Sequence, residues 1–189
     1  KSILDFVVKD LRKEERRSTE RLFDLYEAHL KKAIEVTAAG INLHLDHQWE
    51  VTPELIMNLM MKDSIEKGED ISQCAELFTV GIDGAGLAVV ADSFGALEDR
   101  VEKEHLLSWD DMFEALDNNF ENERTRLILN SAPKYCSGNS SADRWAKRLT
   151  KSWVGLVKAQ EMPEGRQLIP GWFSWSRTIE YGSKVGATP

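Results

Sequence analysis

The chain has 189 residues, of which 42% are hydrophobic and 30% charged, with 24 Lys and Arg against 32 Asp and Glu. This length suits one domain or one segment of a larger domain, and it is enough to bury a core. The formal net charge of -8 argues against binding to nucleic acid or an anionic membrane, because phosphate contacts need clustered basic residues. No apolar run approaches the roughly 20 residues that cross a bilayer. The two cysteines are too few for a disulfide framework, so we expect a cytoplasmic protein.

Helical patterns dominate the first third of the chain. The first 50 residues are predicted to be helical, since apolar residues recur at spacings of three and four over 18–48. The charge run from Lys9 to Arg17 is most simply a solvated helix face. The Thr-Pro-Glu sequence at 52–54 predicts a helix start, because Thr can cap free N–H groups and Pro fits the first helical position. The helix that follows has an apolar face and is expected to end at Lys67-Gly68.

The middle of the chain alternates short apolar runs with further helices. Residues 71–83 favour a strand or extended loop, which the glycines at 81–86 are expected to interrupt. A helix is expected over 87–105, and Ser108 with Asp111 predicts a capping box for the next one. That helix is expected to carry four apolar side chains inward: Met112, Phe113, Leu116 and Phe120.

The last third contains one more helix and a second strand. After a loop at 130–141 rich in Pro, Gly, Ser and Asn, an amphipathic helix is expected from Ser141 through Val157. Aromatics alternate with Ser and Arg over 169–181, which favours a strand. Two strands with helices between them indicate an α/β architecture, and about two to four short strands are expected in all. Two strands are too few for a finished sheet, so partner strands are expected to be missing.

Three patterns could carry chemistry, and each has a structural alternative. Gly81-x-x-Gly84-x-Gly86 suggests a phosphate loop, but no Lys-Ser/Thr pair follows, and a tight turn before a helix is the alternative. His44 and His47 could offer a metal two ligands, or they could be surface or capping residues. Cys74 and Cys136 have neither a neighbouring His nor a Cys-x-x-Cys pattern, and a lone cysteine is usually a small buried apolar residue.

Longer motifs are more specific. Residues 81–98 (GIDGAGLAVVADSFGALE), with IEKGEDIS just upstream, resemble a segment of the glycyl radical enzymes. MFEALDNNF at 112–120 and LNSAPKY at 129–135 resemble that family's next motif. The end of the chain, PGWFSWSRTIEYGSKVGATP, is similar to its GxFSW segment, and RLFDLYEAHLKKAIEV at 21–36 is similar to the helix after its active-site Cys loop. These collinear motifs indicate the pyruvate formate-lyase type of glycyl radical enzyme.

The resemblance implies that residues 1–189 are a helix-rich α/β segment of that family's ten-stranded α/β barrel. In the family, one loop carries a Cys that becomes a thiyl radical. Another loop carries a Gly from which an iron–sulfur activating enzyme removes hydrogen, using S-adenosylmethionine. By family layout the Cys lies before Lys1 and the Gly after Pro189. We therefore carry over no catalytic residue, metal ligand or directly bound cofactor, and expect the isolated chain to be inactive.

For the whole protein, the resemblance implies a homodimeric anaerobic lyase that breaks a C–C, C–O or C–N bond of a small organic substrate. In a wall strand, alternate side chains face inward. We expect some of Phe173, Trp175 and Arg177 to face the substrate cavity, the alternative being that these aromatics pack outward onto helices. Cys136 and the Ser-rich stretch after it replace the family's Gly and acidic residues, so the motif does not indicate which substrate of the family is used. The alternative function is a non-catalytic helical binding or assembly module derived from the same barrel.

Overall fold

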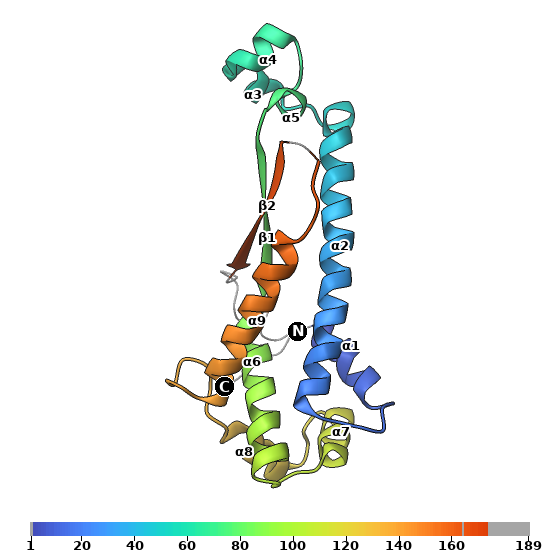
Figure 1. The fold of residues 1–189 in the computed structure, drawn as a ribbon, viewed down its shortest axis with the longest axis vertical. Helices are drawn as coiled ribbons and strands as arrows, with labels where there is room; N and C mark the ends of the chain where they lie inside the picture. The colour runs from blue at the N-terminus through green and yellow to red at the C-terminus, as the bar shows by residue number, and fades with distance from the viewer. Residues whose placement is uncertain (1, 164, 174–189) are drawn as a thin grey trace. The chain divides into compact units, whose positions relative to one another are not determined.

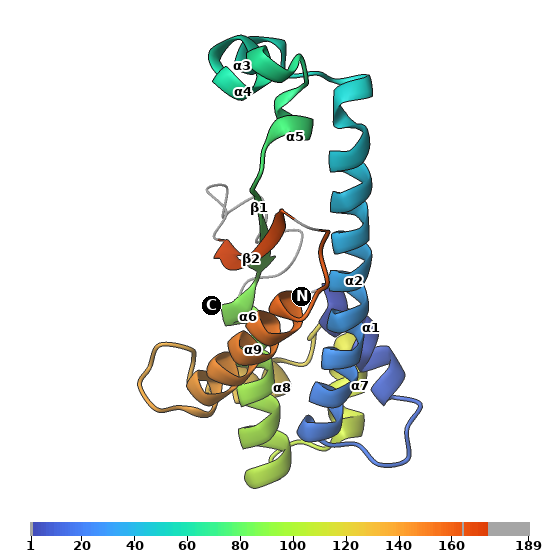
Figure 2. The same ribbon diagram turned by 45° about the horizontal axis from the view of Figure 1, so that its top comes forward.

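The computed structural model describes residues 2–163 and 165–173, which form helices and one pair of strands (Figure 1; Figure 2). The helices are α1 (Ser2–Leu11), α2 (Thr19–Val51), α3 (Leu55–Met60), α4 (Lys62–Lys67), α5 (Ile71–Cys74), α6 (Leu87–Ala96), α7 (Trp109–Asp117), α8 (Glu123–Asn130) and α9 (Ser141–Lys158). A π-helical segment, η1 (Leu97–Lys103), continues α6. The strands are β1 (Phe78–Ala85) and β2 (Arg166–Phe173).

The chain divides into two compact units. Unit 1 contains Lys1–Leu30, Asp83–Val154 and the residues from Trp172 onward, and unit 2 contains Lys31–Ile82 and Gly155–Gly171. Helices α2 and α9 and both strands therefore contribute residues to each unit. Within the described residues, no helix combines the length and apolar composition that a bilayer crossing needs.

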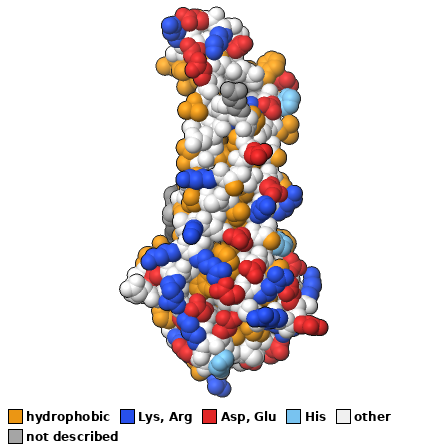
Figure 3. All heavy atoms as spheres, in the orientation of Figure 1, with side chains coloured by type: hydrophobic (Ala, Val, Ile, Leu, Met, Phe, Trp, Pro, Cys, Tyr) orange, Lys and Arg blue, Asp and Glu red, His pale blue; other side chains and the backbone are white. Residues whose placement is uncertain are grey.

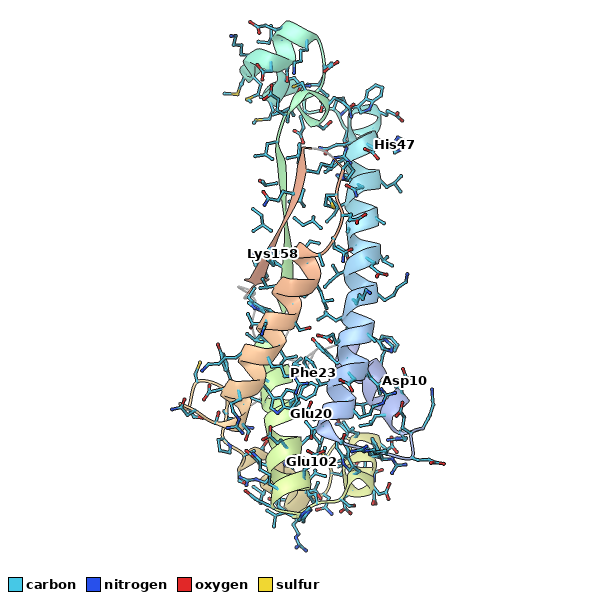
Figure 4. The ribbon with its side chains drawn as sticks, viewed as in Figure 1. Asp10, Glu20, Phe23, His47, Glu102 and Lys158 are labelled. Atoms are coloured by element: carbon cyan, nitrogen blue, oxygen red, sulfur yellow. The ribbon has the colours of Figure 1, made fainter. Side chains whose placement is uncertain are left out.

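Unit 1 is built around an aromatic core. Phe94 of α6 is completely buried, and its ring centroid lies 6.2 Å from that of Phe23, 6.0 Å from Tyr26 and 4.8 Å from Trp145. Figure 4 shows Phe23 on the N-terminal part of α2, directed toward the helices of this core. Edge-to-face and tilted pairs of this kind add to the stabilisation that burial of the rings provides.

Helix α9 follows the pattern that its sequence predicts. Trp145, Leu149, Trp153 and Val157 recur at every fourth position and are all buried, which forms one apolar face. Its start is fixed by a reciprocal cap, in which the Ser140 Oγ accepts the Asp143 amide at 3.0 Å and the Asp143 carboxylate accepts the Ser140 amide.

The charge run near the N-terminus corrects one prediction. Helix α1 ends at Leu11, and Arg12 and Arg17 reach α7 instead of lying on a solvated helix face. Arg12 donates two hydrogen bonds to Asp117, at 3.0 and 2.9 Å, and Arg17 donates one to Asp110 at 2.6 Å. Both guanidinium groups lie about 5 Å from the ring of Phe113. The two arginines therefore hold α7 against the segment that follows α1.

Helix α7 itself confirms the predicted capping box between Ser108 and Asp111. Met112 and Phe113 are buried as expected, but Leu116 is 42% exposed, so the prediction that it points inward is wrong. Phe120 lies beyond the end of the helix and is half-buried. The apolar stripe of this short helix is thus narrower than the spacing suggests.

Unit 2 corrects the prediction of one continuous helix after residue 54. The chain breaks at Met61, whose backbone is extended, so that α3 and α4 are separate. The end of α4 is as predicted, with Gly68 in the left-handed conformation at a φ of 68°. The Asp70 side chain then caps α5, so that residues 71–74 are helical instead of extended.

The two strands pair in parallel. The Phe78 amide donates to the Gly165 carbonyl at one end, and the Trp172 ring lies against Gly84 at the other. Strand β1 passes straight through Gly81 and Gly84, so the predicted interruption there is wrong, and β2 begins earlier than expected. The predicted α/β segment with two strands separated by helices is confirmed.

Candidate functional site

The carboxyl ends of β1 and β2 are the candidate site, because parallel α/β folds place their binding groups there. Residues Asp83–Ala85 and Trp172–Phe173 form these ends, and all of them belong to unit 1. Gly86 follows β1 with a φ of 84° and precedes the first residue of α6. This turn lets the chain pass directly from strand into helix.

Trp172 packs within unit 1. A Cβ atom at Gly84 would lie 2.5 Å from Cζ3 of Trp172, so only glycine leaves room for the indole ring on β1. The other contact is with the buried Trp153 of α9, whose ring centroid lies 5.7 Å away. Trp172 therefore faces α9.

Phe173 follows Trp172 on the strand, and successive side chains of a strand point to opposite faces of the sheet. Phe173 therefore projects from the face opposite to the one that packs on α9, and its side chain is 47% exposed. Trp175 and Arg177 lie outside the described residues. Phe173 is therefore the one predicted site residue that lies within the described part of the chain, and it is at the end of β2.

The glycine motif adopts its structural alternative. Gly84 permits the close approach of Trp172, and Gly86 supplies a positive φ before α6. Both requirements arise from packing and backbone geometry, so the motif is explained without a phosphate ligand.

The candidate metal ligands and cysteines do not form a centre in the described part of the chain. His47 contacts Glu50, with 3.5 Å between Nδ1 and Oε1, and His44 is exposed on the same helix. No group of three or more His, Cys, Asp or Glu side chains suited to a metal ion occurs among the residues that the structure describes. Cys74 is buried, with its Sγ 3.2 Å from the Ser64 Oγ, while Cys136 is exposed in the loop before α9.

A cluster of charged residues on η1 was not identified from the sequence. Glu98 accepts hydrogen bonds from the Trp145 indole at 2.5 Å and from Arg144 at 3.0 Å, and it pairs with Lys103. Burial alone would raise the pKa of Glu98, but these hydrogen bonds outweigh it and the pKa lies below its ordinary value. The carboxylate stays ionised and fixes η1 against the start of α9. The sequence offered no signal for the cluster, since Arg144 and Trp145 lie more than 40 residues from Glu98.

The same cluster borders a hollow of about 250 Å³ in unit 1. Its charged side chains are already paired: Glu98 with Arg144, Glu20 with Arg148, and Glu102 with the Thr19 amide. Figure 4 shows Glu20 at the start of α2 and Glu102 on η1, and both residues line the hollow. The hollow is therefore a less suitable ligand site than the strand ends.

Comparison with known proteins identifies the family. A model of the pyruvate formate lyase-like proteins matches residues 5–182, which is nearly the whole chain. The chain belongs to the pyruvate formate lyase-like family. This confirms the resemblance drawn from the sequence motifs.

The family relatives include enzymes with different substrates. Trans-4-hydroxy-L-proline dehydratase of Clostridioides difficile is 25% identical over 175 residues, which is 91% of this chain and 22% of the relative. Isethionate sulfite-lyase of Desulfovibrio desulfuricans is 27% identical over 78% of this chain and 18% of the relative. A glycyl radical enzyme of Archaeoglobus fulgidus has a solved structure that matches with a TM-score of 0.76 at 25% identity, over 89% of this chain and 23% of that one.

The fold match extends over the entire chain. The B12-independent glycerol dehydratase of Clostridium butyricum matches with a TM-score of 0.83 at 22% identity, over 100% of this chain and 26% of that one. The chain thus spans about a quarter or less of the length of the relatives that it matches. At this identity the match establishes the fold alone.

Proposed function

We propose that this chain forms part of the catalytic barrel of a glycyl radical lyase that acts on a small organic substrate. The observation that carries the proposal is the family match over residues 5–182, together with dehydratase and lyase relatives that span the same segment. The bond that the whole protein breaks is C–C, C–O or C–N.

In this proposal, the chain contributes a wall of the substrate cavity. Phe173 lies at the carboxyl end of β2 on the face opposite to Trp172, which supports a cavity-facing position. Trp175 and Arg177 share the odd-numbered positions of Phe173 in the sequence, and we propose the same role for them. An aromatic and a cationic group there would define the shape and charge of the substrate that is accepted.

The radical groups themselves come from elsewhere in the whole protein. Neither cysteine fits a thiyl relay, because Cys74 is buried against Ser64 and Cys136 lies on an exposed loop. We therefore derive no radical step from this chain and expect it to be inactive alone. The whole protein is proposed to be a cytoplasmic homodimer, whose glycyl radical is installed by an iron–sulfur activating enzyme that uses S-adenosylmethionine.

The test uses the whole polypeptide that contains these residues, incubated without oxygen with a radical S-adenosylmethionine activating enzyme. We expect an organic radical signal in electron paramagnetic resonance and turnover of either trans-4-hydroxy-L-proline or glycerol, whose dehydration breaks a C–O bond. Substitution of Phe173→Ala should lower kcat/KM and leave the radical content unchanged, because the side chain contacts substrate and not the radical groups.

Phe6→Ala is the matched control, since Phe6 is also exposed but lies on α1. The absence of any radical signal would favour the non-catalytic binding or assembly module. A Phe173→Ala protein with normal kinetics on the accepted substrate would instead remove Phe173 from the cavity and leave the enzyme class in place.

A further inference from the structure

Asp83 lies within the glycine motif, and packing explains the glycines of that motif but not Asp83 itself. Gly84 leaves room for the Trp172 ring, and Gly86 supplies the positive φ before α6. Aspartate is uncommon in strands, yet Asp83 lies just before the end of β1. The stability of the strand therefore gives no reason for a carboxylate at this position.

Asp83 lies on the open face of β1. Burial alternates along the end of the strand, so that Gly84 is half-buried while Asp83 and Ala85 are exposed. The Gly84 face is the one covered by Trp172, whose ring also packs on Trp153 of α9. In α/β barrels the helices cover the outer face of the strands. The Asp83 side chain therefore points away from α9, to the inner face.

Phe173 shares this inner face with Asp83. It follows Trp172 on β2, so its side chain points to the side opposite to the one that packs on α9. Strands β1 and β2 are hydrogen-bonded neighbours, and neighbouring strands lie about 4.8 Å apart. A carboxylate and an aromatic ring are thus close enough to contact one small molecule. They lie at the carboxyl ends of parallel strands, where α/β folds place their binding groups.

The Asp83 carboxylate has no hydrogen bond or ion pair with any other residue that the structure describes. It does not cap α6, since the start of that helix has no side-chain cap. An ionised carboxylate accepts hydrogen bonds and donates none. Its partner is therefore a hydroxyl or a protonated amine, and such charge-assisted hydrogen bonds are about twice as strong as neutral ones.

We propose that Asp83 is a substrate-binding residue, whose carboxylate accepts a hydrogen bond from a hydroxyl or protonated amine of the substrate beside the Phe173 ring. This inference rests on the proposed function, because it takes the inner face of the two strands as a wall of the substrate cavity. Asp83 then orients the substrate and takes no part in the radical steps. It selects for a substrate that presents such a donor and against one that presents an anionic group at this position.

Asp83→Asn tests this role, because the amide is nearly the same size and lacks the charge. The whole polypeptide, before activation, is titrated with trans-4-hydroxy-L-proline and with glycerol in a calorimeter. We expect the substitution to raise the Kd of a compound that the wild type binds by about tenfold or more, because hydrogen bonds to charged groups contribute more than neutral ones. In the activated protein it should raise KM more than it lowers kcat and leave the radical content unchanged. A loss confined to trans-4-hydroxy-L-proline identifies the protonated amine as the donor, whereas a loss for glycerol identifies a hydroxyl.

Two further measurements separate binding from a structural role. Without ligand, the thermal midpoint of Asp83→Asn should equal that of the wild type, and the rise in midpoint that the ligand produces should shrink. Asp24→Asn is the matched control, since Asp24 is also an exposed aspartate of unit 1 but lies on α2. This control should leave the Kd unchanged.

An unchanged Kd in Asp83→Asn would overturn the inference. An equal rise in Asp24→Asn would do the same, because the loss of one charge anywhere in unit 1 would then suffice. Failure of the wild type to bind either compound also counts against it, since both compounds present the donors to which the inference commits the site. A protein whose Kd depends on Asp83 but which forms no glycyl radical retains the inference and rejects the proposed function. Radical formation and turnover that do not depend on Asp83 reject the inference alone.

Discussion

The two units of the chain differ in how much of their apolar surface they cover themselves. Unit 1 surrounds Phe94 with three aromatic rings. Unit 2 leaves α3 without a buried residue and exposes large apolar side chains on α3 and α4. The two units, although they lie in the same chain, therefore differ in how far burial of their own side chains can stabilise them. Unit 1 gathers its aromatic side chains into one core, whereas unit 2 leaves the apolar side chains of α3 and α4 exposed in the described part of the chain.

The largest expected change in stability comes from a substitution at the centre of the unit 1 core. Phe94→Ala removes a completely buried ring, and we expect it to lower the free energy of unfolding by about 3–5 kcal/mol. The measurement is the urea midpoint followed by tryptophan fluorescence. Phe6→Ala is the control, since the Phe6 side chain is 61% exposed and should change the midpoint little. Equal losses in the two variants would mean that unit 1 has no dominant core.

Glycine substitutions test packing density in the two units with opposite expected signs. A Cβ at Gly95 in unit 1 would lie 2.8 Å from the backbone nitrogen of Ala142, so Gly95→Ala should destabilise the protein by about 1–3 kcal/mol. A Cβ at Gly155 of α9, in unit 2, would meet nothing within 4 Å. Gly155→Ala should therefore stabilise the protein by up to about 1 kcal/mol, because alanine favours the helix. Thermal melting of both variants checks the difference, and a shift of the same sign in both contradicts it.

The features that the sequence predicts well are those with local causes. The α9 stripe, the capping box at Ser108 and the Gly68 helix end each depend on residues within a few positions of one another. Helix α8 was missed because it lacks an apolar stripe, although Asn122 caps it through the Thr125 amide. Local signals thus fix helix ends more reliably than they reveal a short polar helix.

The features that the sequence does not predict depend on distant partners. Arg12 and Arg17 contact residues of α7 about a hundred positions away, which a run of charges cannot reveal. At the candidate site, the alternation along β2 puts Phe173 and Trp172 on opposite faces, and the contact of Trp172 with Gly84 identifies which face Trp172 occupies. Spacing therefore predicts which residues share a face, and the packing partner decides which face is which.

A smaller effect concerns the Asp70 carboxylate in unit 2, which accepts hydrogen bonds from the Glu54 amide, the Asn58 side chain and the Ser72 amide. Hydrogen bonds from the Asn58 side chain and from Ser72 lower the pKa of Asp70 from 3.8 to about 2. A carboxylate with a lower pKa in the folded state stabilises it above the unfolded pKa, and this contribution is lost as the pH falls from about 4 to about 2. Because Asp70 is close to solvent, we expect less than about 1 kcal/mol.

The measurement compares the wild type with Asp70→Asn. Their free energies of unfolding should differ at pH 6 and converge as the pH falls toward 2. Asp63→Asn, an exposed site on α4, gives the baseline for removing one carboxylate from this region. If the difference in the free energy of unfolding between wild type and Asp70→Asn stayed constant with pH, the charge of the Asp70 carboxylate would not be what stabilises this part of unit 2.

The smallest expected changes in stability distinguish an ion pair from a cation–ring contact in unit 1. Figure 3 shows acidic and basic side chains interleaved over the lower part of the view. Arg148 lies 2.7 Å from the Glu20 carboxylate, and its guanidinium carbon lies 3.9 Å from the centre of the Phe23 ring. Glu20→Gln should cost less than about 0.5 kcal/mol, because exposed ion pairs contribute little. Arg148→Gln should cost more, about 1 kcal/mol, since it also loses the contact with the aromatic core. Urea unfolding at low and high salt distinguishes the two terms, because salt screens the ion pair and leaves the ring contact. If instead the two substitutions cost the same and both losses vanish in salt, the surface charges, and not the aromatic rings, would account for the stability of unit 1 at this face.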